Sequence, residues 1–337
     1  MASPYNPAGI EPETSPASGE EPLWALETES LYLMLGGRTL KTLEFPALVL
    51  TTPFTRLNSG IEQAGPPWND LPRGVDVAVV PALPAESRPP ALAVLPSLIR
   101  YVPKYSPRYF VDLSGSFEEY LAKLGQNARH NLRRRIKRFT EFSGGEIQWK
   151  AFRAPEEMSA FHSLAGAVAE NSWQKRTGGR LFPQVVSLDQ LTSLAAAGRV
   201  RAYALYHQER PVAFSYCVGQ HENLVYTMIG YDEAYAQWSP GNVLYYLFMK
   251  SLFEENRYQH LDFTDGILAY KDFIKTDSIP CARVLYFRRT LKHRLIIAAD
   301  LGLMRISTAS GRLLNSLGLK ARLKKLILGK GARPGQA

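Results

Sequence analysis

Cysteine is scarce in this 337-residue sequence, since Cys217 and Cys281 are the only two. Two cysteines cannot supply a disulfide framework or a four-cysteine zinc site. No apolar run reaches the roughly 18 residues of a membrane-spanning helix, and the opening MASPYNPAGI lacks the basic and apolar regions of a signal peptide. We therefore expect neither a disulfide-stapled secreted protein nor an integral membrane protein, but a cytoplasmic one.

The short motifs of common catalytic sites are also missing. The six histidines show no metal-ligand spacing, and no Walker loop, GxSxG elbow or HExxH motif occurs. We expect no metal site. With 45% hydrophobic and 21% charged residues, the composition is that of a globular protein, which excludes a wholly disordered or collagen-like chain.

The net charge of +9 is distributed unevenly along the chain. Residues 288–337 contain 12 Lys and Arg against the single Asp300, and residues 123–138 contain seven without one acidic residue. These two segments carry +11 and +7, which leaves −9 for the remainder. The sequence therefore indicates a mildly acidic globular protein with two basic segments, and nucleic-acid binding is not its leading interpretation.

Domain boundaries are predicted from composition and periodicity. Residues 1–22 are rich in Pro, Ser, Glu and Ala without apolar periodicity, so we expect a disordered leader. Apolar runs at 47–52 and 75–80, separated by a loop with several Pro and Gly, indicate an α+β half. Four parts are predicted: the leader, an N-terminal half over 23–115, a second domain over 116–290 and a basic amphipathic helical tail over 291–337.

The clearest periodicity lies in the second domain. Ser116 and Glu119 have the spacing of a capping box, and apolar residues at helical spacing continue to Phe139, before a glycine pair. Three later strand-like segments with short polar turns predict an antiparallel meander. The expected elements are a helix over 117–139, a strand over 146–152, helices over 155–175 and after Ser187, strands over 199–206, 211–218 and 224–231, a helix from Ser239, and strands over 258–263 and 283–287.

The first candidate site is the sequence Ser239-Pro240-Gly241-Asn242, preceded by Trp238, at a strand-to-helix junction. Proline is tolerated in a first helical turn, glycine lets a ligand approach the backbone, and the free N–H groups favour an anion. The functional interpretation is a pyrophosphate cradle. The structural alternative is an ordinary helix start.

The second candidate follows the expected strand over 258–263. Asp262 ends this strand and Asp265 lies in the turn after it, where a carboxylate could act as general base on an amine. Tyr270 could protonate a leaving thiolate. The alternatives are aspartates that cap a turn, or a buried ion pair between Asp262 and Lys271 with a structural role only.

The third candidate is the basic helix around Asn127, Arg129, Arg133 and Arg134. Arginine guanidinium groups suit phosphate or carboxylate ligands, and seven cations that repel one another favour an anionic partner. A solvated helix face is the structural alternative. At the end of the next helix, Trp173 and Lys175 are candidates for lining a substrate cleft, with aromatic packing as the alternative for the tryptophan.

These motifs together resemble the CelD-like branch of the GNAT acyltransferase superfamily, which is related to Fem-type aminoacyl transferases. The resemblance covers roughly residues 110–288 and depends on four motifs in the family's order. They are Phe117-Glu-Glu-Tyr-Leu with Asn127-x-Arg129-x-x-Leu-Arg133-Arg134, then Tyr226-Thr-Met-Ile-Gly230-Tyr231-Asp232, then Ser239-Pro240-Gly241, and last Asp262-Phe263-x-x-Gly266-x-x-x-Tyr270-Lys271.

The resemblance implies an α/β (α+β) fold with a twisted mixed sheet flanked by helices, arranged as two GNAT-like halves of which 23–115 would be the degenerate one. It implies acyl-CoA, such as acetyl-CoA, as co-substrate, bound where the central strands splay. Ser239, Gly241 and Asn242 would then hold the phosphates. Asp262 or Asp265 would assist deprotonation of the acceptor, and Tyr231 or Tyr270 would protonate the CoA thiolate.

Relatives commonly act in surface polysaccharide or cell-envelope assembly, so the implied acceptor is an amine or hydroxyl of a sugar or envelope precursor. Two alternatives remain open. A Fem-type enzyme would take its aminoacyl group from tRNA, and a non-catalytic module would bind nucleic acid through the basic helix, with steep salt dependence.

The tail alternates Leu and Ile with Lys and Arg from Leu291 to Leu328. Such faces suit an anionic membrane surface, which would make the protein peripheral to the inner membrane face. The alternatives are a helix packed on the sheet as far as about Met304 and a solvated tail beyond it.

Overall fold

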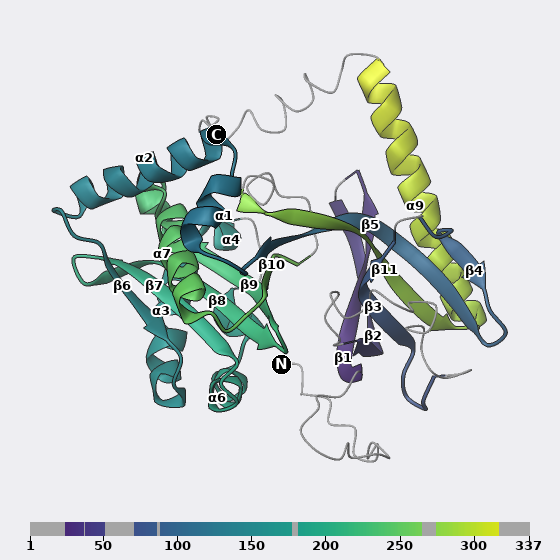
Figure 1. Cartoon of the computed structure of the whole chain (residues 1–337). Coiled ribbons are helices and arrows are strands. Elements are labelled where there is room, and N and C mark those ends of the chain that lie inside the picture. Colours follow the sequence, from purple (N-terminus) through teal and green to yellow (C-terminus); the bar gives the residue numbers. More distant parts are fainter. Residues whose placement is uncertain are drawn as a thin grey trace.

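A single mixed β-sheet runs through the protein, as Figure 1 shows. The computed structural model describes residues 24–36, 38–50, 71–85, 88–176, 181–264 and 274–316. The strands are β1 (Trp24–Leu35), β2 (Arg38–Leu50), β3 (Val77–Pro84), β4 (Leu92–Val94), β5 (Leu98–Asp112), β6 (Gln148–Phe152), β7 (Val200–His207), β8 (Arg210–Gln220), β9 (Asn223–Tyr231), β10 (His260–Asp262) and β11 (Asp277–Arg288).

Helices lie on both faces of the part of the sheet that contains β6 to β10 (Figure 1). A longer helix follows the last strand at the C-terminal side. The described helices are α1 (Phe117–Lys123), α2 (Gln126–Phe142), η2 (Pro155–Glu157), α3 (Met158–Glu170), α4 (Trp173–Arg176), α5 (Phe182–Val185), α6 (Leu188–Ala196), η3 (Glu233–Trp238), α7 (Pro240–Glu255) and α9 (Leu291–Ser316).

The strand order is β1-β2-β3-β11-β5-β10-β9-β8-β7-β6, with β4 paired to β5. Two strand pairs are parallel, β2 with β3 and β9 with β10, and the remaining pairs are antiparallel. Outward from the central pair of β11 and β5, the next three pairings on each side are therefore antiparallel, parallel and antiparallel. The two long strands β5 and β11 bridge the halves, because β5 pairs with β10 and β11 pairs with β3.

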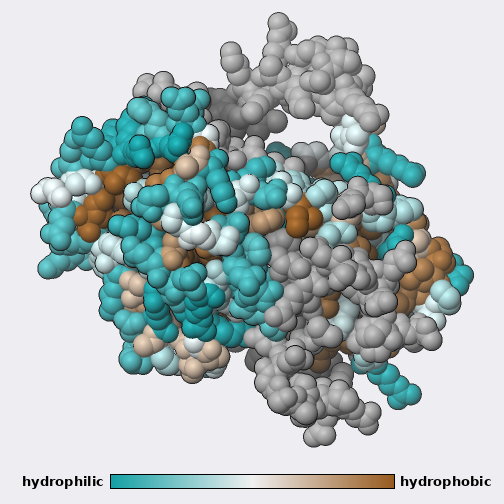
Figure 2. Space-filling model, viewed as in Figure 1, coloured by the Kyte–Doolittle hydropathy of each residue, from teal (hydrophilic) through white to brown (hydrophobic). Residues whose placement is uncertain are grey.

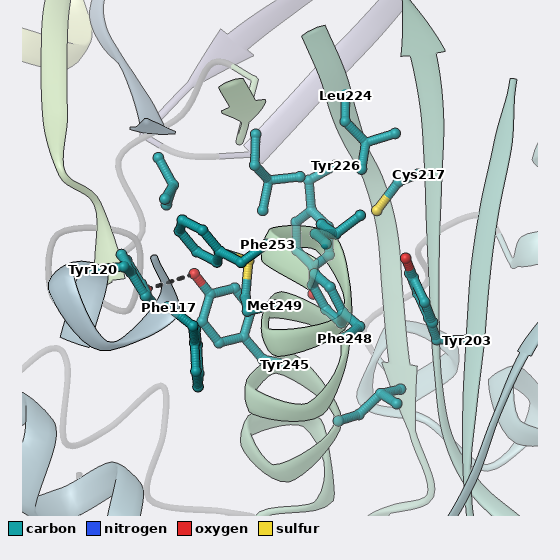
Figure 3. Packing of buried hydrophobic residues seen from close by; sticks show 14 of the residues in the cluster. Phe117, Tyr120, Tyr203, Cys217, Leu224, Tyr226, Tyr245, Phe248, Met249 and Phe253 are labelled. Carbon is teal, nitrogen blue, oxygen red and sulfur yellow. Dashed lines mark hydrogen bonds between the residues drawn. The ribbon is translucent and has the colours of Figure 1, made fainter. Parts of the chain in front are cut away.

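The largest core cluster lies between α1, α2, α7 and one face of the sheet. Figure 3 shows its aromatic centre, where the Tyr120 and Tyr245 hydroxyls are 2.8 Å apart and hydrogen-bonded. Tyr120 also donates to the Ile274 carbonyl at 2.9 Å, so its polar end is satisfied although the ring is buried. On the other sheet face, α3, α5 and α6 cover a second cluster that includes Phe161 and Phe182.

The predicted fold class is confirmed: the structure is a mixed α/β fold with a large twisted sheet flanked by helices. The meander is β7, β8 and β9, within one or two residues of the predicted bounds. The capping box is present, since Ser116 Oγ accepts from Glu119 N at 3.2 Å and Glu119 Oε2 accepts from Ser116 N at 2.7 Å. Ser187 likewise caps α6 by accepting from Gln190 N at 3.2 Å.

Two helices that were predicted as continuous are interrupted in the structure, so these predictions were wrong. The helix expected over 117–139 is broken into α1 and α2, because Leu124 and Gly125 take extended ψ angles of 144° and 149°. Leu124 is buried, so the chain turns there to bring the side chain into the core. The helix expected over 155–175 is η2, α3 and α4 in succession, with the last break at Asn171 and Ser172.

Several strands are longer than their sequence patterns indicated. β1 was not predicted as a strand, β5 runs through Pro103 and Pro107, and β11 begins six residues before Arg283. The predicted leader and the segment 265–273 lie outside the described residues, as do residues 317–337 of the tail.

Candidate active site

The two parallel strands at the centre of the second half separate after a short contact. β9 and β10 are aligned only from Asn223 opposite His260 to Val225 opposite Asp262. β10 ends there, whereas β9 continues to Tyr231 and, among the described strands, pairs beyond Val225 with β8 alone. A register shift between Tyr216 and Cys217 leaves Thr227 as an extra residue in β9. One edge of β9 is therefore left without a described strand partner from Thr227 to its end.

The chain passes from this end of β9 through η3 to the start of α7. Ser239 has left-handed angles (φ 54°, ψ 47°), and its hydroxyl makes no capping hydrogen bond. Its carbonyl instead accepts from Asn242 N at 3.0 Å and Val243 N at 3.2 Å. Pro240 has no N–H, so the Gly241 N–H is the first backbone donor that points out of the helix.

Gly241 is buried, and its missing side chain serves close packing. A Cβ on Gly241 would lie 3.3 Å from Ile229 Cδ1 and 3.6 Å from Tyr231 Cδ1 on β9. The sequence interpretation assigned this glycine to close approach of a ligand. The structure shows that it also lets α7 approach β9. Ser239 and Asn242 are partly exposed beside it, as a cradle would require.

Trp238 is held in a stack of side chains. Its ring lies 4.2 Å from the Phe142 ring, at an interplanar angle of 14°, and the Arg138 guanidinium carbon is 4.9 Å from its centroid. Phe142 in turn stacks on His207 at 4.2 Å. These contacts fix the C-terminal half of the basic helix α2 against η3, directly before the start of α7. Two candidate regions far apart in sequence are thereby joined.

The cations of α2 lie on two different flanks. At 3.6 residues per turn, Arg134 and Asn127 share the flank of Arg138, whereas Arg129 lies nine residues, or about two and a half turns, from Arg138. Arg129 therefore faces away from η3. Arg133 lies closer around the helix to Arg129 than to Arg138. Burial, and then the nearby Arg134, lower the pKa of Arg135.

Next to this region, α4 is attached to the same end of β9. Gln174 Nε2 donates to the Ile229 carbonyl at 2.6 Å, and Arg176 pairs with Glu233 of η3 at 2.9 Å. Trp173, a predicted cleft residue, is 44% exposed. Lys175, the other one, is exposed and pairs with Glu170.

Asp262 lies at the point where β9 and β10 separate, and its carboxylate is already hydrogen-bonded within the protein. Its carboxylate is 2% exposed and accepts from Arg108 of β5, with Nε at 2.9 Å from Oδ1 and 2.8 Å from Oδ2. Oδ1 also accepts from Thr264 N at 2.8 Å. A carboxylate held in this way is a poor general base, because its lone pairs are already used. The arrangement favours the alternative of a structural ion pair, with Arg108 as the partner.

Tyr231 lies at the opposite end of the open edge. Burial, and then the Glu233 carboxylate, raise the pKa of its hydroxyl, while Arg176 opposes the change. It is therefore protonated at neutral pH and able to donate. Six residues at about 3.3 Å each place Tyr231 roughly 20 Å along β9 from Val225, the partner of Asp262. Tyr231 and Asp262 are thus too far apart along the sheet to act on the same reacting atom. Asp265, Tyr270 and Lys271 lie outside the described residues.

A cleft opens on the other face of the sheet, between β1 and the α5–α6 side of the second half. Its volume is about 500 Å³. Partial burial, and then Glu29, raise the pKa of Glu27 in its wall. It reaches Val225 and Thr227, at the point where β9 and β10 part. The lining residues are Ala25, Glu27, Val185, Val186, Gln190, Leu194, Arg199, Tyr216, Val218, Gln220, Val225 and Thr227.

Sequence reasoning missed four residues that shape this region: Arg108, Arg138, Phe142 and Gln174. The spacing of Arg134 and Arg138 by four residues is a pattern that would have identified their common flank. Arg108 gave no such indication, because it lies 154 residues before its partner Asp262. Among the described residues, no group of three His, Cys, Asp or Glu side chains is placed to hold a metal ion.

Comparison with known proteins gives one match to a family. Residues 126–272 match the model of the family described as acetyltransferase (GNAT) domain. This segment contains α2, β9, η3, α7 and β10, which are the elements of the site. A search of curated proteins finds no match to the chain.

Solved structures resemble the chain only distantly. A C-terminal DUF2156 domain from Agrobacterium fabrum is 11% identical, with 78% of this chain and 84% of that chain covered and a TM-score of 0.47. L-PGS from Bacillus licheniformis is 12% identical, with 81% and 88% covered and a TM-score of 0.45. FemX is 9% identical, with 81% and 90% covered and a TM-score of 0.45.

Proposed function

The chain belongs to the GNAT superfamily through residues 126–272, and from this premise we propose that it is an acyltransferase that uses acyl-CoA. The observation that carries the proposal is the separation of β9 from β10, with the start of α7 at the far end of the open edge of β9. The acceptor is proposed to be an amine or hydroxyl of a sugar or cell-envelope precursor.

The phosphates of CoA would lie at the start of α7. Three features support this position: the outward N–H of Gly241, the partly exposed side chains of Ser239 and Asn242, and the cations of α2 on the flank of Arg138. The packing of Phe142 and Arg138 on Trp238 holds these cations beside the helix start. The acyl arm would then run along the edge of β9 that has no described strand partner, past the Ile229 carbonyl that accepts from Gln174, toward Thr227.

In the proposed reaction the acceptor attacks the thioester carbon directly. The C–S bond breaks, the acceptor loses a proton to a base, and the CoA thiolate takes one from an acid. Asp265 is the preferred base among the two predicted aspartates, because Asp262 is occupied by Arg108. Tyr270 is the preferred acid, because Tyr231 lies at the phosphate end of β9, roughly 20 Å from Val225.

The cleft of about 500 Å³ is the proposed entrance for the acceptor. It reaches Thr227 from the face of the sheet opposite to α7, so donor and acceptor would approach the same part of β9 from two sides. Its wall combines aliphatic side chains with Glu27, Gln190, Arg199 and Gln220. Such a mixture suits an acceptor that carries several hydroxyl or amide groups.

A second candidate is Fem-type aminoacyl transfer, with aminoacyl-tRNA as the donor. The cations of α2 favour it, since they would suit a nucleic-acid backbone as well as a pyrophosphate. The N-terminus of α7 is a small anion site and favours CoA. The two donors are distinguished by ligand binding.

The test is thermal unfolding with acetyl-CoA or with tRNA. A ligand at about 100 times its Kd that binds only the folded protein should add about 2.7 kcal/mol to the free energy of unfolding. Stabilisation by acetyl-CoA supports the proposal. No effect of acetyl-CoA together with stabilisation by tRNA would refute it and support the second candidate.

The site is tested with Asn242→Asp. The added carboxylate lies in the first turn of α7, where it interacts favourably with the helix dipole but repels a phosphate. We expect the unliganded protein to be as stable as wild type and the acetyl-CoA shift to be largely lost. Gln259→Glu is the matched control, because this exposed residue after the C-terminus of α7 takes the same isosteric change of charge. Equal shifts in both variants would contradict a phosphate site at α7.

A further inference from the structure

The helix α9 has one face that is fully used by the fold. His293, Ile297 and Asp300 are buried, and Ile297 belongs to the cluster formed with Phe45 and Leu285 of the sheet. Asp300 accepts from the buried Tyr101 hydroxyl of β5. At the far end of the contact, Gly36 N donates to Ser307 Oγ at 3.1 Å. The helix is thus fixed in orientation over most of its described length.

The opposite face of α9 carries an apolar stripe that no described element covers. Leu291 is 73% exposed, Leu295 is 62% exposed and Ile306 is 55% exposed. These residues share one side of the helix, within about 80° of arc at about 100° per residue. We call this set the outer stripe; its members are Leu291, Leu295, Ala298, Gly302 and Ile306.

The charges around the outer stripe have one sign. Arg294 and Arg305 lie along one side of it, and neither makes an ion pair within the described part of the chain. Lys292 lies on the other side, where it pairs with Asp76 at 3.3 Å. The single acidic residue of α9, Asp300, is buried on the sheet side. The exposed face of the helix therefore combines leucine and isoleucine with unpaired arginine.

We propose that the outer stripe of α9 docks on the surface of an anionic phospholipid bilayer. The helix would lie parallel to the membrane surface. The outer stripe would be buried at the boundary between headgroups and acyl chains, and the arginines would contact lipid phosphates. Figure 2 shows hydrophobic side chains gathered on the side of the molecule where α9 and β4 lie, and Leu92 and Val94 of β4 are 43% and 60% exposed. None of the described helices is long and apolar enough to cross a membrane.

Charge and chemistry favour a bilayer over two other partners. A nucleic acid would use the arginines but gains nothing from exposed leucines. A second copy of this helix would bring Arg294 and Arg305 against the same cations, with no exposed acidic residue on α9 to pair them. Lipid headgroups and acyl chains satisfy both features at once. The proposal is independent of the acyltransferase activity.

The test is co-sedimentation of the full chain with vesicles of phosphatidylcholine, with and without phosphatidylglycerol. We expect binding to the anionic vesicles that weakens as salt is added, and little binding to the neutral ones. Leu291→Glu with Leu295→Glu should raise the apparent Kd for anionic vesicles by at least about tenfold. Both side chains are exposed, so the variant should unfold at the wild-type temperature.

The control variant is Leu26→Glu with Leu188→Glu, which adds the same two charges at exposed leucines away from α9. It should bind vesicles within about twofold of wild type, because charges remote from the contact are largely screened. Three results would overturn the proposal: no vesicle binding, equal loss in both double variants, or a dimer in solution that the α9 variant alone dissociates.

Discussion

The two halves of the sheet contain equivalent parallel pairs, and the pair in the second half leads into the candidate site. β2 and β3 are aligned over three residue pairs, as are β9 and β10. In the second half β9 continues for six residues after Val225, its last residue paired with β10, and then leads through η3 to the start of α7. The shared pairing pattern sets the fold, and the length of β9 beyond β10 creates the candidate site.

The halves also differ in how their sheet faces are covered. In the second half, α7 and α2 lie on one face and α3, α5 and α6 on the other. In the first half, α9 covers one face, through Ile296, Ile297 and Leu301. The side of α9 that faces away from the sheet stays exposed among the described residues, and this side carries the outer stripe. The second half thus contains the candidate site, and the first half contains the surface proposed for docking.

The largest expected effect concerns the ion pairs that join strands in each half. Asp262→Asn removes the buried carboxylate that pairs with Arg108, whose side chain is only partly exposed, and we expect the free energy of unfolding to fall by about 3 kcal/mol. Glu29→Gln in the first half should cost less, because its partner Arg283 is 29% exposed against 13% for Arg108. Urea unfolding of both variants measures the difference. An equal or larger loss for Glu29→Gln would contradict a special role for Asp262 at the separation of β9 and β10.

A smaller effect, on acetyl-CoA affinity, is expected when cations are removed from one or the other flank of α2. Arg134→Gln with Arg138→Gln removes cations on the η3 side, and we expect acetyl-CoA affinity to fall about tenfold. Arg133→Gln with Arg129→Gln removes the same charge from the other flank and should reduce affinity no more than about twofold. Calorimetric titration of both double variants compares them. Equal losses would show that α2 acts through its total charge and not through its position against Trp238.

Much of this architecture follows from local sequence. The meander, both serine caps and the start of α7 were predicted because turns, caps and apolar periodicity are short-range patterns. The break at Gly125 was not, since Leu124 is drawn into the core by tertiary packing that the helical spacing does not contain. β1 was missed for a similar reason: much of the strand is exposed, so it lacks the apolar alternation of a half-buried strand.

The site was predictable in its parts but not in its assembly. The α7 start and the basic helix were identified separately, yet their union depends on Phe142 and Arg138 packing on Trp238, across about a hundred residues of sequence. The alternative interpretation paired Asp262 with Lys271, which lies outside the described residues, and the described contact is with Arg108. An ion pair between strands that are distant in sequence leaves no spacing rule from which it could be inferred. The assignments of Asp265, Tyr270 and Lys271 stay predictions.

Hydrogen exchange with and without acetyl-CoA tests the central claim most directly, since it compares the two parallel pairs in one experiment. If the open edge of β9 and the start of α7 bind the donor, amides over 226–241 should become protected when acetyl-CoA is added. Amides of β2 over 38–50 should exchange at an unchanged rate in the same sample. Protection that is absent from 226–241, or that is equal in β2, would contradict the account.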